Sequence, residues 1–326
     1  MVFKILDIFR IKYVNLYIFS INNMNKKLIR FDWAIKRLLR NKSNFVVLEG
    51  FLSELLFDNI KIEQILESES NQFTEDDKFN RVDILTQNSK NELLIIEIQS
   101  TYDRRSLLEN LKKTNRKAEK IDYFHRMAYG ASKSISENHK LGSKYNEIKK
   151  VISINIVYFD LGQGQDYIYK GKTDFIGLHQ NDLLGLSEKQ KTTFLKENIS
   201  DIFPEFYLLK VNQFNDNAKD TLDEWIYFLK NSEVKEEFKA KGLKEAGEVL
   251  DIMKLEKEDQ YGYNRYMDSL SHKASEIFTL YNEAEFNAKE NIAKNGILKG
   301  YENTIIADLT NLTFKQIENL REELKK

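Results

Sequence analysis

The stretch that decides the fold is RVDILTQNSKNELLIIEIQ, residues 81–99. Two runs rich in Val, Ile and Leu, RVDILTQ and LLIIEIQ, flank the polar segment NSKNE. Apolar runs of strand length on both sides of a short polar segment predict a β-hairpin. If the loop has an odd number of residues and the pairing is centred on Lys90, Asp83 lies directly opposite Glu97.

Three polar side chains of this hairpin are candidates for catalysis. Glu97 and Gln99 are separated by one residue, so their side chains leave the same face of the strand. Asp83 faces them from the other strand, and two carboxylates directly opposite each other across the strand pair need a cation. Paired carboxylates with water and a main-chain carbonyl suit Mg²⁺, which polarises phosphate and lowers the pKa of an attacking water. The pattern therefore indicates phosphodiester hydrolysis.

A simpler interpretation is that Asp83 and Glu97 are exposed ends of an ordinary amphipathic hairpin. The run LLIIEIQ argues against it, because apolar residues flank Glu97 on both sides. They place the Glu97 carboxylate in or near the core, where an unpaired charge costs several kcal/mol. We therefore expect a base or a metal ion to neutralise it.

The rest of the chain predicts a mixed α/β (α+β) architecture. Apolar residues at three- and four-residue steps indicate one or two helices over residues 32–57. The run VISINIVYF, residues 151–159, is typical of a strand buried on both faces, and IFPEFYLLKV, residues 202–211, adds another. After LDEWIYFLK the chain becomes helical by propensity. We expect an N-terminal extension at 1–24, where Met24 opens a stretch that reads as a natural start, a domain at 25–231 and a helical region at 232–326.

Composition narrows the class of protein. The chain has 326 residues and no cysteine, which excludes disulfide scaffolds, thiolate zinc sites and cysteine nucleophiles. Lys and Arg number 50 against 51 Asp and Glu, so any nucleic-acid partner must be attracted by local charge. Charged residues interrupt the apolar first twenty residues, and we expect no membrane span. A cytoplasmic protein fits these features best.

A series of ordered blocks carries a family resemblance. D-x13-E-x-Q on a hairpin, preceded by a helix and followed by a basic helix, resembles the PD-(D/E)XK nuclease superfamily. More narrowly, the blocks RFDWAIKRLLRNKSNFVVLEGFL, DDKFNRVDIL, LLIIEIQS, DYFHRMAYGASK and INIVYFDLGQGQDYIYKG look like the bacterial recombination-promoting nuclease and transposase family. The resemblance covers about residues 30–230. It implies a restriction-endonuclease-like core, a mixed sheet flanked by helices.

The resemblance also implies roles for particular residues. Asp83 and Glu97 would be metal-binding acids, the carbonyl of Ile98 would complete the metal shell, and Gln99 would stand where the superfamily usually has Lys. Glu49, in VVLEGFL, matches a place where many members carry a further acid; the alternative is a solvated helix position. The implied cofactor is Mg²⁺ (or Mn²⁺), and Asp83, Glu97 and Gln99 would be the catalytic residues.

Basic segments flank the proposed acids and predict DNA as the partner. Residues 101–150 hold 13 Lys and Arg against 6 Asp and Glu, and residues 25–44 hold 7 against 1. Such a cationic rim suits the phosphate backbone, although a solvated helix face explains any single Lys as well. The candidate DNA-binding residues are Arg126, His125, Lys112, Lys113 and Arg116.

The last residues, IIADLTNLTFKQIENLREEL, predict a helix, a turn at Asn311 and a second helix with Thr313 as N-cap. This resembles the helix-turn-helix-like tail of the family, whose second helix would contact DNA bases. The alternative role is packing or assembly as a homo-oligomer.

The expected function is a metal-dependent DNA endonuclease linked to recombination or a mobile element. The alternative is a catalytically inactive DNA-binding transposase relic, which the long segment after Gln99, residues 100–121, favours. A third interpretation, a helical interaction protein that does not bind DNA, requires the basic segments to be incidental.

Overall fold

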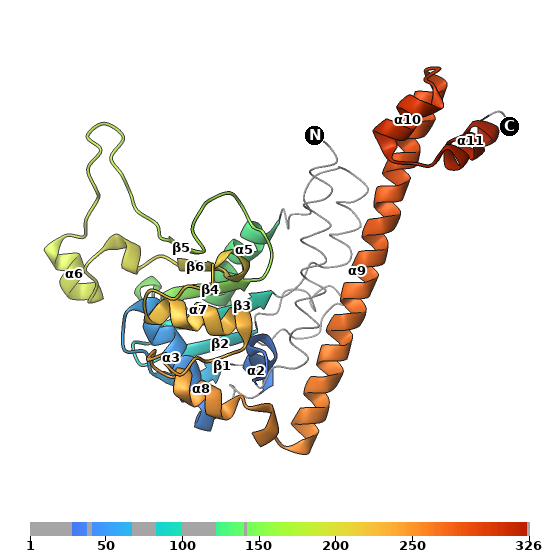
Figure 1. Cartoon of the computed structure of the whole chain (residues 1–326). Helices are drawn as coiled ribbons and strands as arrows, with labels where there is room; N and C mark the ends of the chain where they lie inside the picture. Colours follow the sequence, from blue (N-terminus) through green and yellow to red (C-terminus); the bar gives the residue numbers. More distant parts are fainter. Residues whose placement is uncertain (1–27, 38–40, 67–82, 100–121, 140–141, 325–326) are drawn as a thin grey trace. The chain divides into compact units, whose positions relative to one another are not determined.

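The computed structural model describes residues 28–37, 41–66, 83–99, 122–139 and 142–324, with the backbone alone at 35–37, 253, 273–274, 277–278 and 281 (Figure 1). Residues 1–24, Lys112, Lys113 and Arg116 lie outside the described residues. The described chain divides into two compact units, one up to Tyr266 and one from Met267 onward. Among the described residues, no helix is both long and apolar enough to cross a bilayer.

A mixed six-stranded sheet forms the centre of the first unit. Its strands are β1 (Ile62–Leu66), β2 (Ile84–Asn88), β3 (Leu93–Gln99), β4 (Val151–Val157), β5 (Ile168–Gly171) and β6 (Glu205–Lys210). The spatial order is β1-β2-β3-β4-β6-β5. The pairs β3–β4 and β4–β6 are parallel, and the remaining pairs are antiparallel. The sheet with its flanking helices confirms the predicted α/β restriction-endonuclease-like fold.

The hairpin has the register that the sequence predicts. Ile84 pairs with Ile96 and Gln87 with Leu93, so every pair is centred on position 90. The turn residue Asn91 has a φ of 60°, a left-handed conformation that Asn tolerates. One further step of this register sets Asp83 opposite Glu97.

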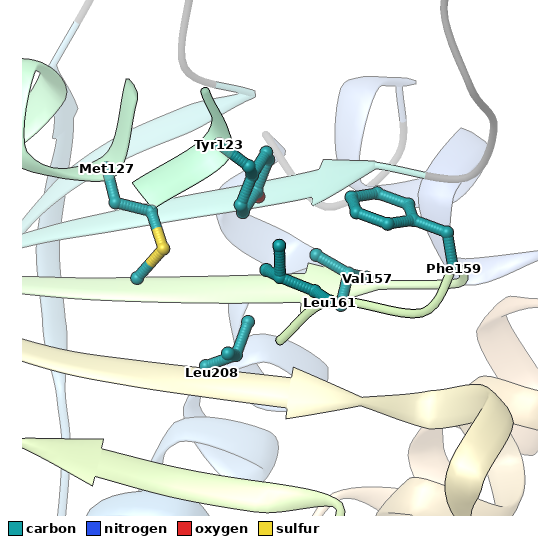
Figure 2. Packing of buried hydrophobic residues seen from close by; sticks show 6 residues of the cluster. All are labelled: Tyr123, Met127, Val157, Phe159, Leu161 and Leu208. Carbon is teal, nitrogen blue, oxygen red and sulfur yellow. The ribbon is translucent and has the colours of Figure 1, made fainter. Parts of the chain in front are cut away.

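Helix α5 (Tyr123–Asn138) covers the sheet face that holds the odd-numbered residues of β3. Figure 2 shows part of this packing, where Tyr123 and Met127 of α5 meet Val157 and Leu208 of the sheet. Phe159 packs its ring against Tyr123, with 5.5 Å between the ring centroids. Because side chains alternate along a strand, Glu97 and Gln99 also leave toward the α5 face.

The opposite face is covered by α7 (Thr221–Asn231), since Tyr158, one residue after β4, donates its hydroxyl to Leu229 O at 2.7 Å. Helices α2 (Phe31–Arg37) and α3 (Phe45–Leu56) join α7 there. Edge-to-face and tilted ring contacts hold these three helices together; they involve Phe31, Phe51, Trp225 and Phe228.

The first unit extends beyond the expected domain boundary at 231. Helix α8 (Leu243–Val249) contacts α3, and Trp225 donates its indole N–H to Lys241 O at 3.1 Å. Gly50 and Gly242 make this packing possible, because a Cβ at either position would overlap the backbone of the other segment. Residues 232–266 therefore belong with the sheet.

The remaining elements are α6 (Glu188–Phe194), the long α9 (Lys257–Leu298), α10 (Asn303–Thr310), α11 (Phe314–Glu323) and short 3₁₀ turns at Lys42–Asn44, Tyr145–Glu147, Ile199–Asp201, Val211–Gln213 and Ile252–Lys254.

The end of the second unit is the predicted helix, turn and helix. Asn311 has a φ of 56°, and Thr313 caps α11 in a reciprocal capping box with Gln316. A small core closes the arrangement; it consists of Ala293, Ile306, Leu312, Ile317 and Leu320.

Candidate functional site

Asp83 is held at the entrance of the hairpin by a backbone hydrogen bond. It precedes β2 by one residue, and its Oδ2 accepts the Ile98 N–H at 2.7 Å. This bond brings the carboxylate to the segment 97–99 of β3. The structure therefore brings the Asp83 carboxylate to the backbone of Ile98, the residue that follows Glu97.

Glu97 is buried, with 7% of its surface exposed, inside the strand that the sequence marked as apolar. Arg126 of α5 supplies the neutralising base, with 2.5 Å between Arg126 Nη2 and Glu97 Oε1. The two residues come from different layers, so the ion pair also ties α5 to the sheet. The expectation that a base or a metal compensates Glu97 is met by a base in this structure.

Asn155 of β4 is the strand neighbour of Glu97 on the other side. It is 1% exposed and donates its amide to Ser153 Oγ at 3.0 Å and to Tyr207 O at 3.4 Å. Sequence analysis missed this residue, because VISINIVYF reads as a continuous apolar run. The signal was present: a lone Asn within a fully buried strand needs polar partners.

Tyr123, at the start of α5, donates its hydroxyl to Asn155 Oδ1 at 3.4 Å. Burial raises the pKa of the Tyr123 hydroxyl well above its usual value, and the nearby charge of Glu97 raises it further. The Arg126 charge opposes this shift, while Asp83 adds to it. The hydroxyl therefore stays protonated and serves as a hydrogen-bond donor beside the two acids.

Gln99 ends β3, and its side chain is half-buried. Its carbonyl accepts the Tyr158 N–H at 3.1 Å, which continues the parallel pairing of β3 with β4. The Gln99 amide can orient a water molecule on the face of Glu97, but it adds no positive charge.

The sequence model of the PD-(D/E)XK nuclease family transposases matches residues 29–279. The chain belongs to this family. The match spans the whole sheet, both layers of helices around it and part of α9. No curated protein and no solved structure matches the chain. Membership supports a nuclease-like or transposase-related function with DNA as partner, and PD-(D/E)XK nucleases generally use divalent metal ions.

Glu49, the further acid that the family resemblance implied, lies elsewhere. Its Oε1 accepts the Ile62 N–H at 2.9 Å and its Oε2 pairs with Lys61 Nζ at 2.7 Å. Ile62 pairs with Asn88, at the opposite end of β2 from Asp83. Five residues of strand separate these ends by about 16 Å. The structure thus does not bring Glu49 to the paired acids, because this carboxylate binds the start of β1.

The two described candidates for DNA binding sit on α5. His125 is exposed, and Arg126 is half-buried against Glu97. Arg126 therefore contacts one of the paired acids and is also partly accessible to solvent on α5.

The pair Asp83 and Glu97 suits a divalent ion that needs only a few ligands from the protein. Within the described ranges, no group of three or more Asp, Glu, His or Cys side chains gathers at one point. Asp83 and Glu97 would supply two carboxylates to such an ion, and Ile98 would supply a backbone carbonyl. Mg²⁺ commonly binds through one or two carboxylates and keeps several waters, so this oxygen set suits it.

Proposed function

We propose that this PD-(D/E)XK family chain is a DNA endonuclease that depends on Mg²⁺ (or Mn²⁺) and acts in recombination or in a mobile element. The observation that carries the proposal is the register of the hairpin, which sets Asp83 opposite Glu97, together with the bond from Ile98 N–H to Asp83. In a chain of this family, paired acids at that place on a sheet covered by the helix that carries Arg126 support hydrolysis of phosphodiesters.

Asp83, Glu97 and the carbonyl of Ile98 would hold the ion. When bound, it would polarise the scissile phosphate and lower the pKa of the attacking water. Gln99, on the same strand face as Glu97, orients that water through its amide. Tyr123 stays protonated beside the acids and helps to fix Asn155, the neighbour of Glu97.

Arg126 has two uses in this proposal. Without an ion it compensates the charge of Glu97, with which it is paired. With an ion held at Glu97, the Arg126 guanidinium would be available for a backbone phosphate, with which Arg forms strong charge-assisted hydrogen bonds. DNA and metal would therefore bind cooperatively.

A supercoiled-plasmid assay tests the proposal with four proteins: wild type, Asp83→Asn, Glu97→Gln and the control Glu92→Gln. Glu92 is an acid of the same hairpin, and it bonds to Asn88 at the turn. We expect nicking in Mg²⁺ or Mn²⁺ at low salt by wild type and control, and none in EDTA. Each site variant should lose at least about 100-fold in rate, the scale of removing a group that stabilises the transition state.

Equal cutting by wild type and both site variants would contradict the proposal. Folding of each variant is checked by circular dichroism, so that lost activity is not mistaken for lost structure.

The alternative function is a DNA-binding relic without turnover. Two observations favour it: Glu97 is already neutralised by Arg126, and Gln99 lacks the charge that the superfamily Lys brings. Retention of plasmid by wild type without cutting in any metal would establish this alternative.

A further inference from the structure

The connection between β5 and β6 is far longer than is needed to join two neighbouring antiparallel strands. Residues 172–204, here called the arm, project away from the sheet in Figure 1. Structureless connections beyond about 12–15 residues are uncommon, and those that are ordered usually have a function. The arm plays no part in the site around Asp83 and Glu97, so it needs an explanation of its own.

The arm is ordered by its own contacts. Ile176 forms a β-bridge with Leu183, and backbone hydrogen bonds flank this bridge on both sides. At the base of the arm, the rings of Phe175 and Phe203 lie 5.3 Å apart. Ser187 begins α6 with a reciprocal capping box. A segment held in one shape loses little conformational entropy when it binds.

Large apolar side chains of the arm face solvent. Leu178 is 93% exposed and Leu195 is 87% exposed. Six more are at least one-third exposed: Phe175, Ile176, Leu183, Leu184, Phe194 and Ile202. Together their exposed fractions amount to about five whole side chains, or roughly 300–600 Å² of apolar surface. That total equals the area of the largest apolar patch on a typical monomer, and apolar surface exposed on this scale usually marks a binding site.

The charge of the arm separates it from the proposed DNA surface. It carries four Lys against five Asp and Glu, whereas residues 101–150 carry a large basic excess. A nearly neutral apolar surface attracts no phosphate backbone. It fits an equally neutral apolar protein surface.

We propose that the arm is the surface through which two copies of this chain associate, arm against arm about a two-fold axis. Two features support a second copy as the occupant. The exposed side chains of the arm are largely apolar and the arm is nearly neutral, so it can face a second arm without repulsion, as a two-fold interface requires. The exposed apolar area of the arm also fits: interfaces are a little over half apolar, so this area corresponds to an interface of roughly 500–1,000 Å² per copy, against about 800 Å² in a standard-size interface.

Association also extends the proposed function, on which this step rests. One chain holds one Asp83–Glu97 pair, and a dimer holds two. Two such centres in one particle can cut both strands of a duplex in a single encounter.

The test is the mass of the full-length chain in solution, by light scattering after size exclusion, without DNA or metal ions. At about 10 µM chain, above the Kd of most standard-size interfaces, we expect twice 38.5 kDa for wild type. The triple variant Leu178→Ser, Leu183→Ser and Leu195→Asn should run at 38.5 kDa. Asn suits position 195, where φ is 53°.

The matched control is Phe57→Asn with Tyr145→Ser. These side chains are 85% and 86% exposed outside the arm, and Phe57 also has a left-handed φ, 52°. The control should keep the dimer mass, and all variants should keep the wild-type circular dichroism. Wild type at the mass of one chain, or a triple variant that stays dimeric, would overturn the proposal. Because no cleavage is measured, the result is independent of whether the chain is a nuclease.

Discussion

The guanidinium of Arg126 lies 2.5 Å from Glu97 Oε1, so the helix that covers the sheet supplies the counter-charge for the buried acid within it. Glu97 is 7% exposed, and burial of a carboxylate without such a partner is strongly unfavourable. The pair therefore stabilises the fold and occupies one oxygen of a proposed metal ligand. Breaking the Arg126–Glu97 pair should therefore change both the free energy of unfolding and the affinity for the metal ion.

Arg126→Ala tests this coupling. We expect a loss of about 1–3 kcal/mol in the free energy of unfolding without metal, because Glu97 keeps its charge and loses its partner. Mn²⁺ should restore more stability to the variant than it adds to wild type. Urea unfolding with and without Mn²⁺ measures both effects. Lys133→Ala, which breaks the i,i+4 pair with Glu137 on the same helix, should change stability by less than about 0.5 kcal/mol. If Mn²⁺ stabilised wild type and Arg126→Ala equally, Arg126 and the metal ion would not compete for Glu97, contrary to our prediction.

Asn155→Ala should destabilise the sheet beside Glu97. The Asn155 amide bonds to Ser153 Oγ and to Tyr207 O in the interior, so its removal leaves buried polar groups without their partner, at a cost of about 1–3 kcal/mol. Tyr123→Phe removes a single hydroxyl contact of 3.4 Å to Asn155 and should cost less than about 1 kcal/mol. Thermal unfolding ranks the two variants, and a larger loss for Tyr123→Phe would reverse our assignment of the stronger partners.

The sequence was sufficient to predict the hairpin, because two independent patterns agreed there. Apolar runs marked the strands, and the polar segment between them marked the turn. The opposition of Asp83 and Glu97 then followed from counting on the condition that the loop has an odd number of residues, which the observed register meets. The buried position of Glu97 followed from its apolar neighbours in the same way. The capping signal of Thr313 and the turn at Asn311 were equally local, and the structure shows both.

Other features depend on contacts between distant segments. Glu49 lies on the predicted helix, but its partners are Ile62, which begins an edge strand, and Lys61 just before it, and no local pattern aligns them with Glu49. Arg126 was a candidate for binding phosphate, and its pairing with Glu97 became visible only when α5 was placed on the sheet. The packing of α8 on α3 likewise depends on two glycines that are 192 positions apart in sequence.

Those glycines give a stability prediction. A Cβ at Gly50 would overlap the Lys241 carbonyl, which belongs to backbone and cannot move aside cheaply. Gly50→Ala should therefore lose at least about 2 kcal/mol through overpacking. Gly247, on α8, is the control, since the nearest atom to its added Cβ is Val234 Cγ2 at 4.0 Å. Gly247→Ala should gain about 0.5–1 kcal/mol from helix propensity. Equal stability of the two variants in urea would contradict the close packing of the segment at Lys241 and Gly242 on α3.

The ion cluster at the start of β6 predicts how stability depends on pH. Glu205 contacts Lys150 Nζ at 2.8 Å, Lys170 Nζ at 2.5 Å and the Tyr207 hydroxyl at 2.6 Å. Burial alone would raise the pKa of Glu205, but these three partners lower it from 4.5 to about 2. Because the pKa is lower in the folded state, the contribution of Glu205 to stability is complete above pH 4.5 and is lost as the pH falls toward 2.

Glu205→Gln should therefore be less stable than wild type by about 1–3 kcal/mol at pH 7, since it leaves the Lys150 and Lys170 charges without their counter-charge. The difference should shrink steadily between pH 5 and pH 2, as protonation makes the wild-type carboxyl neutral as well. Urea unfolding at pH 7, 5, 4 and 3 follows this change. Glu188→Gln, which breaks only an exposed i,i+3 pair with Lys191, should stay close to wild type throughout. A difference between Glu205→Gln and wild type that does not vary with pH would mean that the cluster acts through packing rather than through the charge of Glu205.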